Sequence, residues 1–271
     1  MDKLNLYKVL NILVTIFFAL IALIPFYSLL ITALSTPTWQ NILFPEFHFQ
    51  NYSDAWKDSR LGTALINSSL ITSFSLLLIV ITSGCAGYAI ARVKNVFHNI
   101  VFNAFLFSMM VPAIINTVPL YILMRKINGI NTHWAMVLLL TTAAIPFATF
   151  LYTSFIETMS KEVEESAFID GCSKFMIFWR VVFPLLKPVT SSVIILNAVS
   201  IWNNYGTAVF FLQKQSMQTV PLAISSFVQT YGANWNLMAA AAFIGLLPAV
   251  VIFLFFQKYF IKGIAAGSVK G

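Results

Sequence analysis

Six long apolar segments constrain what this chain can fold into. A helix that crosses a bilayer needs about 20 mostly apolar residues, and each of the six is long enough. They cover residues 6–34, 61–91, 100–124, 134–155, 185–212 and 237–260. Charged residues make up only 9% of the chain, whereas soluble domains carry roughly 25%. We therefore expect an all-α integral membrane protein with six transmembrane helices, built as a single transmembrane domain over residues 1–271.

The placement of Lys and Arg predicts the orientation of these helices. If both termini are cytoplasmic, eleven of the 16 Lys and Arg residues lie on the inner side. The outer side then holds the other five, Lys57, Arg60, Arg125, Lys126 and Lys214. This excess follows the positive-inside rule. The loop over residues 157–187 is then cytoplasmic, and the loops over 35–60 and 213–236 face outward.

Several classes of function lack the residues that they need. No phosphate loop of the form Gly-x4-Gly-Lys-Ser/Thr occurs, so we do not expect this chain to bind ATP by itself. No carboxylate falls within a predicted span, which argues against a proton- or sodium-coupled carrier. No Cys/His spacing resembles a metal site, and no basic run suggests nucleic-acid binding. We expect no cofactor in this chain, and a partner that supplies energy.

The loop over residues 157–187 collects most of the acidic side chains. Five of the nine carboxylates lie there: Glu157, Glu162, Glu164, Glu165 and Asp170. A hydrophobic chain that gathers its acids in one loop is expected to use that loop as a docking surface. A hairpin resting on lipid headgroups is the alternative, but an anionic inner leaflet disfavours these acids.

Local signals predict two short helices in this loop. Ser160 is expected to cap the first helix, and Gly171 to end it in the left-handed conformation. Ser173 is expected to cap the second helix. Pro184 and Pro188 then bend the chain before the next span. On the second helix the spacing predicts a single apolar stripe, formed by Phe175, Phe178, Trp179 and Val182.

The same loop resembles a known motif. Glu165-Ser166-Ala167, three residues, Gly171, nine residues and Val181-x-Phe183-Pro184 are similar to the EAA loop of ABC importer permeases. That loop reads Glu-Ala-Ala, three residues, Gly, nine residues, Ile-x-Leu-Pro, so three positions differ conservatively. The pairs Asn51-Tyr52, Asn67-Ser68 and Trp202-Asn203 resemble the carbohydrate branch, and the resemblance extends over nearly the whole chain.

This resemblance implies a type I ABC importer permease fold and a transport subunit that is not an enzyme. The implied partners are a second homologous permease, two ATP-binding subunits that hold Mg-ATP, and an extracytoplasmic sugar-binding protein. The EAA loop would be the coupling helix that enters a cleft of the ATPase, where Glu165 would face a basic group. Ala167 and Gly171 would allow close helix approach, and Asp170 would make polar contacts or cap the turn. The implied coupling residues are Glu165, Ser166, Ala167, Asp170, Gly171, Phe175, Phe178 and Trp179.

Polar residues in the fifth segment are candidates for the transport path. Asn197, Ser200 and Asn204 recur at helical spacing, with Trp202 and Asn203 a little to the side. Small polar residues are also common between packed helices, and that reading stays open. Pro112 and Asn116 are expected to kink the third segment. The outer loop over 213–236 resembles the loop that reaches into a binding protein, with a plain interfacial loop as the alternative.

Two rival functions remain at this level. The first is an ABC permease for another solute, such as a polyol, glycerol phosphate or peptide. The second is a membrane-embedded enzyme or scaffold. The sequence clusters no His, Asp or Cys at membrane depth, and a scaffold would not need the EAA-like loop.

Overall fold

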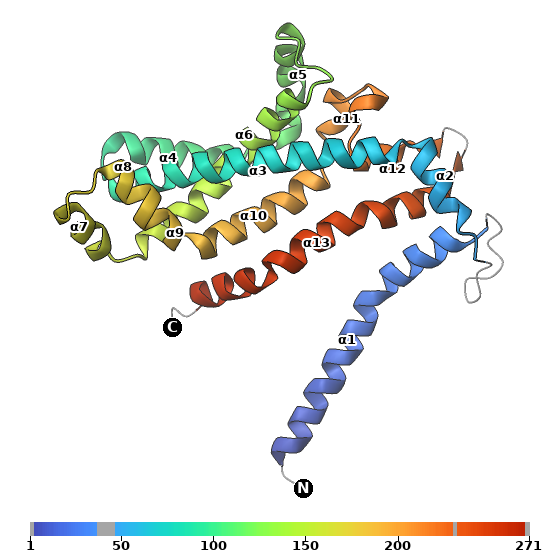
Figure 1. Ribbon diagram of the computed structural model, residues 1–271, viewed down its shortest axis with the longest axis horizontal. Coiled ribbons are helices and arrows are strands. Elements are labelled where there is room, and N and C mark those ends of the chain that lie inside the picture. The colour runs from blue at the N-terminus through green and yellow to red at the C-terminus, as the bar shows by residue number, and fades with distance from the viewer. Residues whose placement is uncertain (1–2, 37–46, 230–231, 269–271) are drawn as a thin grey trace. The chain divides into compact units, whose positions relative to one another are not determined.

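The computed structural model describes residues 3–36, 47–229 and 232–268 (Figure 1). Parts of both predicted outer loops, residues 37–46 and 230–231, lie outside the described residues, as do 1–2 and 269–271. Most of the described chain is helical. The two short strands β1 (Val228–Gln229) and β2 (Gly232–Ala233) pair antiparallel, with Val228 opposite Ala233. The prediction of an all-α fold is confirmed, apart from this small hairpin.

The helices follow one another with short connections. In chain order they are α1 (Lys3–Leu34), α2 (Gln50–Asp58), α3 (Leu61–Arg92), α4 (Val96–Met109), η1 (Ala113–Asn116), α5 (Thr117–Lys126), α6 (His133–Glu157), α7 (Glu162–Ile169), α8 (Lys174–Met176), η2 (Ile177–Val182), α9 (Phe183–Leu185), α10 (Lys187–Trp202), α11 (Ala208–Phe211), η3 (Gln215–Met217), α12 (Val220–Ser225) and α13 (Trp235–Ser268). Of these, η1 and η3 are 3-10 helices and η2 is a π-helix.

Four of the described helices are long and apolar enough to cross a membrane, namely α1, α3, α6 and α13. Two further stretches pass the same criteria only as bent pairs. Val96–Met109 with Ala113–Lys126 bends by 99°, and Lys174–Leu185 with Lys187–Trp202 bends by 73°. The six predicted spans result if each bent pair forms one span.

Two of the predicted segments are corrected by these breaks. The third is not one helix over 100–124, because the chain leaves the helix at Met110 and restarts after Pro112. Proline lacks an N–H and disfavours helix at the residue before it, so the kink predicted at Pro112 is confirmed. The fifth segment does not continue to residue 212. It ends at Trp202, where Asn203 and Asn204 favour a turn over a helix interior.

The chain divides into two compact units, residues 63–222 with 248–271 and residues 1–62 with 223–247. In the larger unit, α6 packs against α4 and α10, and one hydrophobic core extends from Ile71 on α3 to Leu222 on α12. Gly87 allows α3 and α6 to approach closely. A Cβ at Gly87 would lie 2.6 Å from the Cβ of Tyr152 and 3.1 Å from the backbone nitrogen of Thr153.

In the smaller unit, two asparagine side chains satisfy the end of α1. The last carbonyls of a helix have no partner within it. Asn51 Nδ2 donates to the carbonyl oxygens of Ala33 and Ser35, at 2.9 Å each. Asn236 Nδ2 donates to Thr32 (2.9 Å) and Ser35 (2.6 Å). The Asn51-Tyr52 pair therefore has a structural role: Asn51 closes α1, and the ring of Tyr52 meets that of Phe243 at 6.2 Å.

We predict that Gly87→Ala destabilises the protein, whereas Gly84→Ala on the same helix does not. A methyl group at Gly87 would collide with backbone and Cβ atoms, so α3 and α6 must separate; overpacking of this kind costs about 1–3 kcal/mol. At Gly84 the nearest atom is Cε2 of Phe183 at 3.6 Å, an ordinary contact. The measurement is the thermal unfolding midpoint of each purified variant in mild detergent. Equal midpoints for the two variants would contradict this account of the α3–α6 contact.

Candidate functional site

The acidic loop forms a short helix, α7, at the C-terminal ends of α3 and α6 (Figure 1). Ser160 Oγ accepts a hydrogen bond from the backbone N–H of Glu162 at 3.2 Å. However, Ser160 is not the cap that was predicted: Lys161 is the N-cap residue, and no side chain caps the helix there. Glu162, Glu164 and Glu165 occupy the first turn, where negative charge is favoured by the helix dipole.

Gly171 ends α7 as predicted. Its φ is +84°, in the left-handed region that favours glycine. The Gly171 N–H donates to the carbonyl of Phe168, and the Cys172 N–H donates to that of Ala167, both at 3.0 Å. These two bonds define a Schellman motif. Apart from Gly171 and its two chain neighbours, no described residue has an atom within 4 Å of the position that a Cβ of Gly171 would take. Its backbone conformation, and not close packing, therefore explains glycine here.

The second helix of the loop differs from the prediction. Ser173 caps it as expected, since Ser173 Oγ accepts from the N–H of Met176 at 3.3 Å. The helix then widens into the π-helix η2, which breaks the 3.6-residue spacing. The four apolar residues therefore do not form one exposed stripe. Phe175 is exposed, Trp179 is half-buried, and Phe178 and Val182 are buried within the chain.

The buried aromatic rings fix the loop to α3. The ring of Phe178 lies 5.1 Å from that of Tyr88 and 4.9 Å from that of Trp179. Phe183 contacts Trp179 at 5.0 Å and packs beside Gly84. Rings at such separations in tilted or edge-to-face arrangements attract one another beyond simple burial. Phe178 is thus buried in the base of the loop, whereas its predicted role places it at a partner surface.

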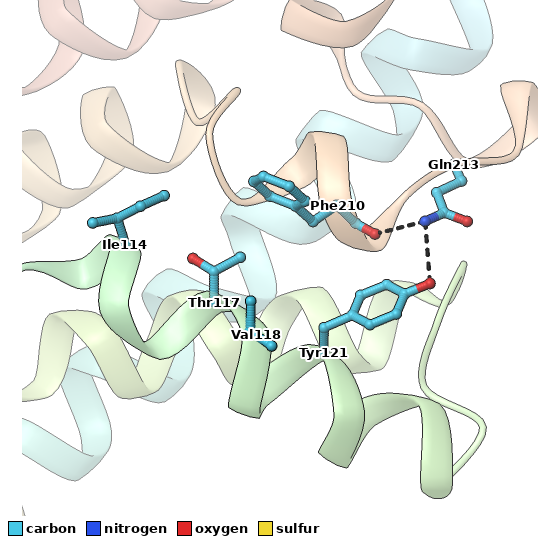
Figure 2. Close-up of a pocket in the computed structure, with 6 residues that line it drawn as sticks. All are labelled: Ile114, Thr117, Val118, Tyr121, Phe210 and Gln213. Carbon is cyan, nitrogen blue, oxygen red and sulfur yellow. Dashed lines mark hydrogen bonds between the residues drawn. The ribbon is translucent and has the colours of Figure 1, made fainter.

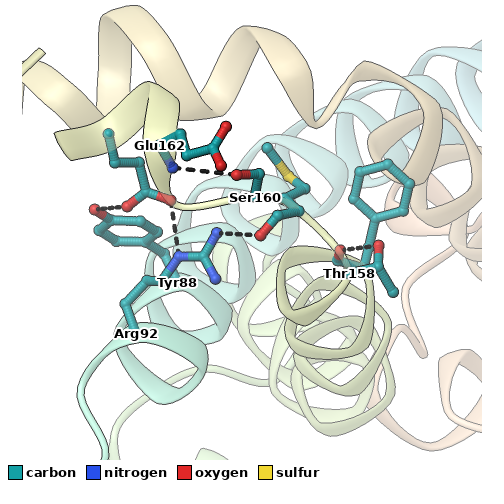
Figure 3. A network of polar contacts seen from close by, with 8 residues as sticks. Tyr88, Arg92, Thr158, Ser160 and Glu162 are labelled. Atoms are coloured by element: carbon teal, nitrogen blue, oxygen red, sulfur yellow. Dashed lines mark hydrogen bonds and ion pairs between the residues drawn. The ribbon is translucent and has the colours of Figure 1, made fainter. Parts of the chain in front are cut away.

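A polar cluster joins α7 to the end of α3 (Figure 3). Arg92 Nε donates to Glu164 Oε1 at 2.7 Å, and Tyr88 Oη donates to Glu164 Oε2 at 2.8 Å. Arg92 Nη2 also donates to the carbonyl of Met159 at 3.2 Å. By sequence alone, Arg92 is one of the eleven Lys and Arg residues predicted to lie on the inner side, and Glu164 is one of the five acids of the loop. The spacing of Tyr88 and Arg92 at i and i+4 puts both on one helix face, and was a signal for this contact.

The opposite face of α7 is exposed. Of the predicted coupling residues, Glu165, Ser166 and Asp170 are exposed, whereas Ala167 is half-buried against the core. Large apolar side chains are exposed among the acids: Val163, Phe168, Phe175 and, at 84%, Ile169. Within the described chain Glu165 makes no ion pair. Apolar groups beside unpaired carboxylates are typical of a surface that meets a protein partner.

The candidate path residues are not on one helix face. Asn197 is buried, and its Nδ2 donates to the carbonyl of Val193 at 2.8 Å. Trp202 is buried, whereas Ser200 and Asn203 are exposed. Asn204 lies beyond the end of α10, where its Oδ1 accepts from the N–H of Thr207 at 3.1 Å before α11. Within this set only Ser200 and Asn203 are therefore exposed on the surface of the chain.

A cavity of about 360 Å³ lies elsewhere, between η1–α5 and the end of α11 (Figure 2). It is lined by Ile114, Thr117, Val118, Tyr121, Phe210 and Gln213. Gln213 Nε2 donates to Tyr121 Oη at 3.3 Å and to the carbonyl of Phe210 at 3.1 Å. None of the predicted path residues lines this mainly apolar cavity.

The first part of the predicted outer loop is firmly packed. Asn67 Nδ2 donates to the carbonyls of Ser216 (3.0 Å) and Gln218 (2.9 Å), and Asn67 Oδ1 lies 2.9 Å from His133 Nε2. Ser68 Oγ accepts from the N–H of Val220 at 2.9 Å. The Asn67-Ser68 pair thus holds residues 216–220 against the start of α3. The tip of the loop, at 230–231, lies outside the described residues.

Comparison with known proteins identifies the family. The profile of binding-protein-dependent transport system inner membrane components matches residues 83–266. The chain belongs to this family. It is therefore an inner membrane component of a transport system and not an enzyme. The match includes α7, the Schellman turn and Arg92.

Two curated relatives of this permease match it over almost their full length. The melibiose/raffinose/stachyose import permease protein MelC of Bacillus subtilis is 40% identical over 96% of each chain. The probable starch degradation products transport system permease protein AmyC of Thermoanaerobacterium thermosulfurigenes is 31% identical over 100% of each. The resemblance to carbohydrate ABC importer permeases is confirmed.

A solved structure supports the same fold. The permease superposes with a TM-score of 0.81 on a chain of a bacterial ABC transporter involved in the import of the acidic polysaccharide alginate. The match covers 96% of this chain and 99% of the other, at 20% identity. It confirms the ABC importer permease fold.

We predict that Gly171→Ala loosens the end of α7. An L-residue in the left-handed conformation costs about 1–2 kcal/mol, which raises the open fraction of the turn roughly 5- to 30-fold. Hydrogen exchange of the amides at positions 171 and 172 should accelerate by that factor. Gly206→Ala is the matched control, because its Cβ would meet open space and its φ is not positive. Unchanged exchange at position 172 would contradict the proposed role of the turn.

Proposed function

We propose that this permease is a transmembrane subunit of an ATP-driven, binding-protein-dependent importer of sugars or oligosaccharides. The observation that carries the proposal is the form of α7, a short acidic and apolar helix exposed on one face and fixed to α3 on the other. Relatives named for melibiose, raffinose, stachyose and starch products favour a carbohydrate substrate. The loop over 157–187 is then cytoplasmic, and α7 is the coupling helix.

The proposed complex contains a second homologous permease, two ATP-binding subunits and an extracytoplasmic sugar-binding protein. Mg-ATP binds to the partner subunits, since this sequence has no phosphate loop. ATPase closure would displace α7, tilt the attached spans and open the sugar path outward; hydrolysis would reset the state. The exposed residues Glu165, Ser166 and Asp170 would meet the ATPase, with Glu165 facing a basic group.

The first experiment is purification of the tagged permease from its native membranes, followed by mass spectrometry of the proteins that accompany it. An ATPase, a second permease and a sugar-binding protein are expected. Stimulation of ATP hydrolysis by raffinose with its binding protein, and not by a peptide or glycerol phosphate, would support the carbohydrate assignment. Recovery of the permease alone, under conditions that preserve other membrane complexes, would overturn the proposal.

We predict that Glu165→Lys weakens recovery of the ATPase or uncouples it from transport. The change reverses an exposed charge that is proposed to face a basic group, and loss of such a pair weakens association by roughly tenfold or more. Gly171→Asp should have the same effect, because it strains the turn that ends α7, the helix that carries Glu165, and adds a negative charge there. Asp58→Lys, which makes the same charge change at the exposed end of α2, should retain the ATPase. Full assembly and transport in both loop variants would refute the docking role.

We further propose that Asn203 contacts the sugar on its path, as the one exposed asparagine of the set Asn197, Ser200, Trp202, Asn203 and Asn204. Loss of one hydrogen bond costs about 1 kcal/mol, so Asn203→Ala should reduce transport at low sugar concentration by roughly two- to tenfold, with assembly unchanged. Asn103→Ala, at an exposed asparagine on α4, is the matched control. Asn197→Ala should instead lower stability. Unchanged transport and sugar preference in Asn203→Ala would exclude this role.

A further inference from the structure

We propose that Tyr88, Arg92 and Glu164 form a tether that passes displacement of α7 to α3, with Arg92 as its central positioning residue. This inference rests on the proposed function, since it assumes that a partner displaces α7. The tether connects two parts of the chain that lie 72 residues apart in sequence. Neither Arg92 nor Tyr88 belongs to the EAA-like loop.

The geometry of the cluster makes it a firm contact. Both oxygens of the Glu164 carboxylate are engaged, one by Arg92 Nε and one by Tyr88 Oη. The side chains of Arg92 and Glu164 are only 9% and 14% exposed. A shielded ion pair with added hydrogen bonds is screened less by water and salt than a surface pair. Arg92 also donates to the carbonyl of Met159. It therefore contacts the connection between α6 and α7 as well as α7 itself.

The tether is specific among the charges of the loop. In the part of the chain that the structure describes, Arg92–Glu164 is the one ion pair, although Glu162, Glu165 and Asp170 lie close by in sequence. Glu164 points to α3, whereas its neighbour Glu165 is exposed. Of these two adjacent carboxylates, Glu164 therefore attaches the loop to α3, and Glu165 lies on its exposed surface.

The receiving helix is suited to transmit motion. Helices α1, α6 and α13 contain Pro25, Pro146 and Pro248, whereas α3 has no proline over its 32 residues. Proline is a common cause of helix kinks. At the rise of an α-helix, Arg92 and Asn67 are roughly 38 Å apart along α3. Asn67 and Ser68 hold residues 216–220 by their backbone. A displacement at Arg92 would thus reach the opposite end of this unit through one unbroken helix.

The test measures sugar transported per ATP hydrolysed by the reconstituted complete transporter. Arg92→Gln and Glu164→Gln should each lower this ratio about tenfold, a typical size for coupling between sites, while the complex still assembles. The double variant should be no worse than either single one, because both remove the same interaction. Lys94→Gln is the matched control: it removes a positive charge two residues further on, at an exposed side chain with no ion pair in the described chain.

A second, more conservative variant tests the proposal if the Arg92→Gln complex does not assemble. Tyr88→Phe removes only the hydroxyl that donates to Glu164 and keeps the ring against Phe178. It should lower the transport ratio by a smaller factor, with assembly and ATP hydrolysis retained. An unchanged ratio in an assembled Arg92→Gln complex, or in Tyr88→Phe where that complex does not form, would overturn the proposal.

Covalent replacement of the tether gives an independent test. In a variant in which Cys85 and Cys172 are replaced by alanine, Arg92→Cys with Glu164→Cys should uncouple transport, and a short bifunctional thiol cross-linker should restore it. Failure of the cross-linked form to regain the ratio would show that α7 and α3 must move independently. If the wild-type permease recruits no ATPase at all, the proposed function fails and the coupling role of the tether fails with it. A wild-type complex that couples normally, with variants that couple equally well, overturns the tether alone.

Discussion

Buried backbone groups at the end of a helix need hydrogen-bond partners. In the described residues this constraint accounts for the polar contacts at several helix ends. The last carbonyls of α1 are satisfied by Asn51 and Asn236, and the carbonyls of Ser216 and Gln218 by Asn67. At the end of α7 the backbone itself provides the bonds, because Gly171 adopts the left-handed conformation. At each of these three places a specific residue supplies the bonds that the end of the helix or the loop lacks.

Helix α3 makes several of the specific contacts of the larger unit. Its Gly87 allows α6 to approach, its Asn67 and Ser68 fix residues 216–220, and Tyr88 and Arg92 lie near its C-terminal end. Each contact is made by a different face or end of one continuous helix. One helix thus holds both the acidic loop at its C-terminal end and residues 216–220 near its N-terminal end.

The helical class, the kink at Pro112 and the caps at Gly171 and Ser173 could be predicted from the sequence, because each depends on local backbone chemistry. The predicted cap at Ser160 was wrong, since Lys161 borders α7. The predicted end of the fifth span was wrong, since the apolar residues of α11 follow the turn at Asn203 and Asn204. The predicted apolar stripe was also wrong, because the π-helix η2 changes the number of residues per turn. That widening accompanies the packing of Phe178 against Tyr88, a tertiary contact that helical periodicity cannot anticipate.

The sequence by itself determined that this chain enters a membrane as helices and carries one acidic, EAA-like loop, because apolar length and turn chemistry are local properties. Only the tertiary structure decided what the acids of that loop do. Glu164 and Glu165 are adjacent and chemically identical, yet Glu164 pairs with Arg92 and Glu165 is exposed. The difference arises because neighbouring residues of a helix point in directions about 100° apart, and only the folded chain places α3 on one of those sides.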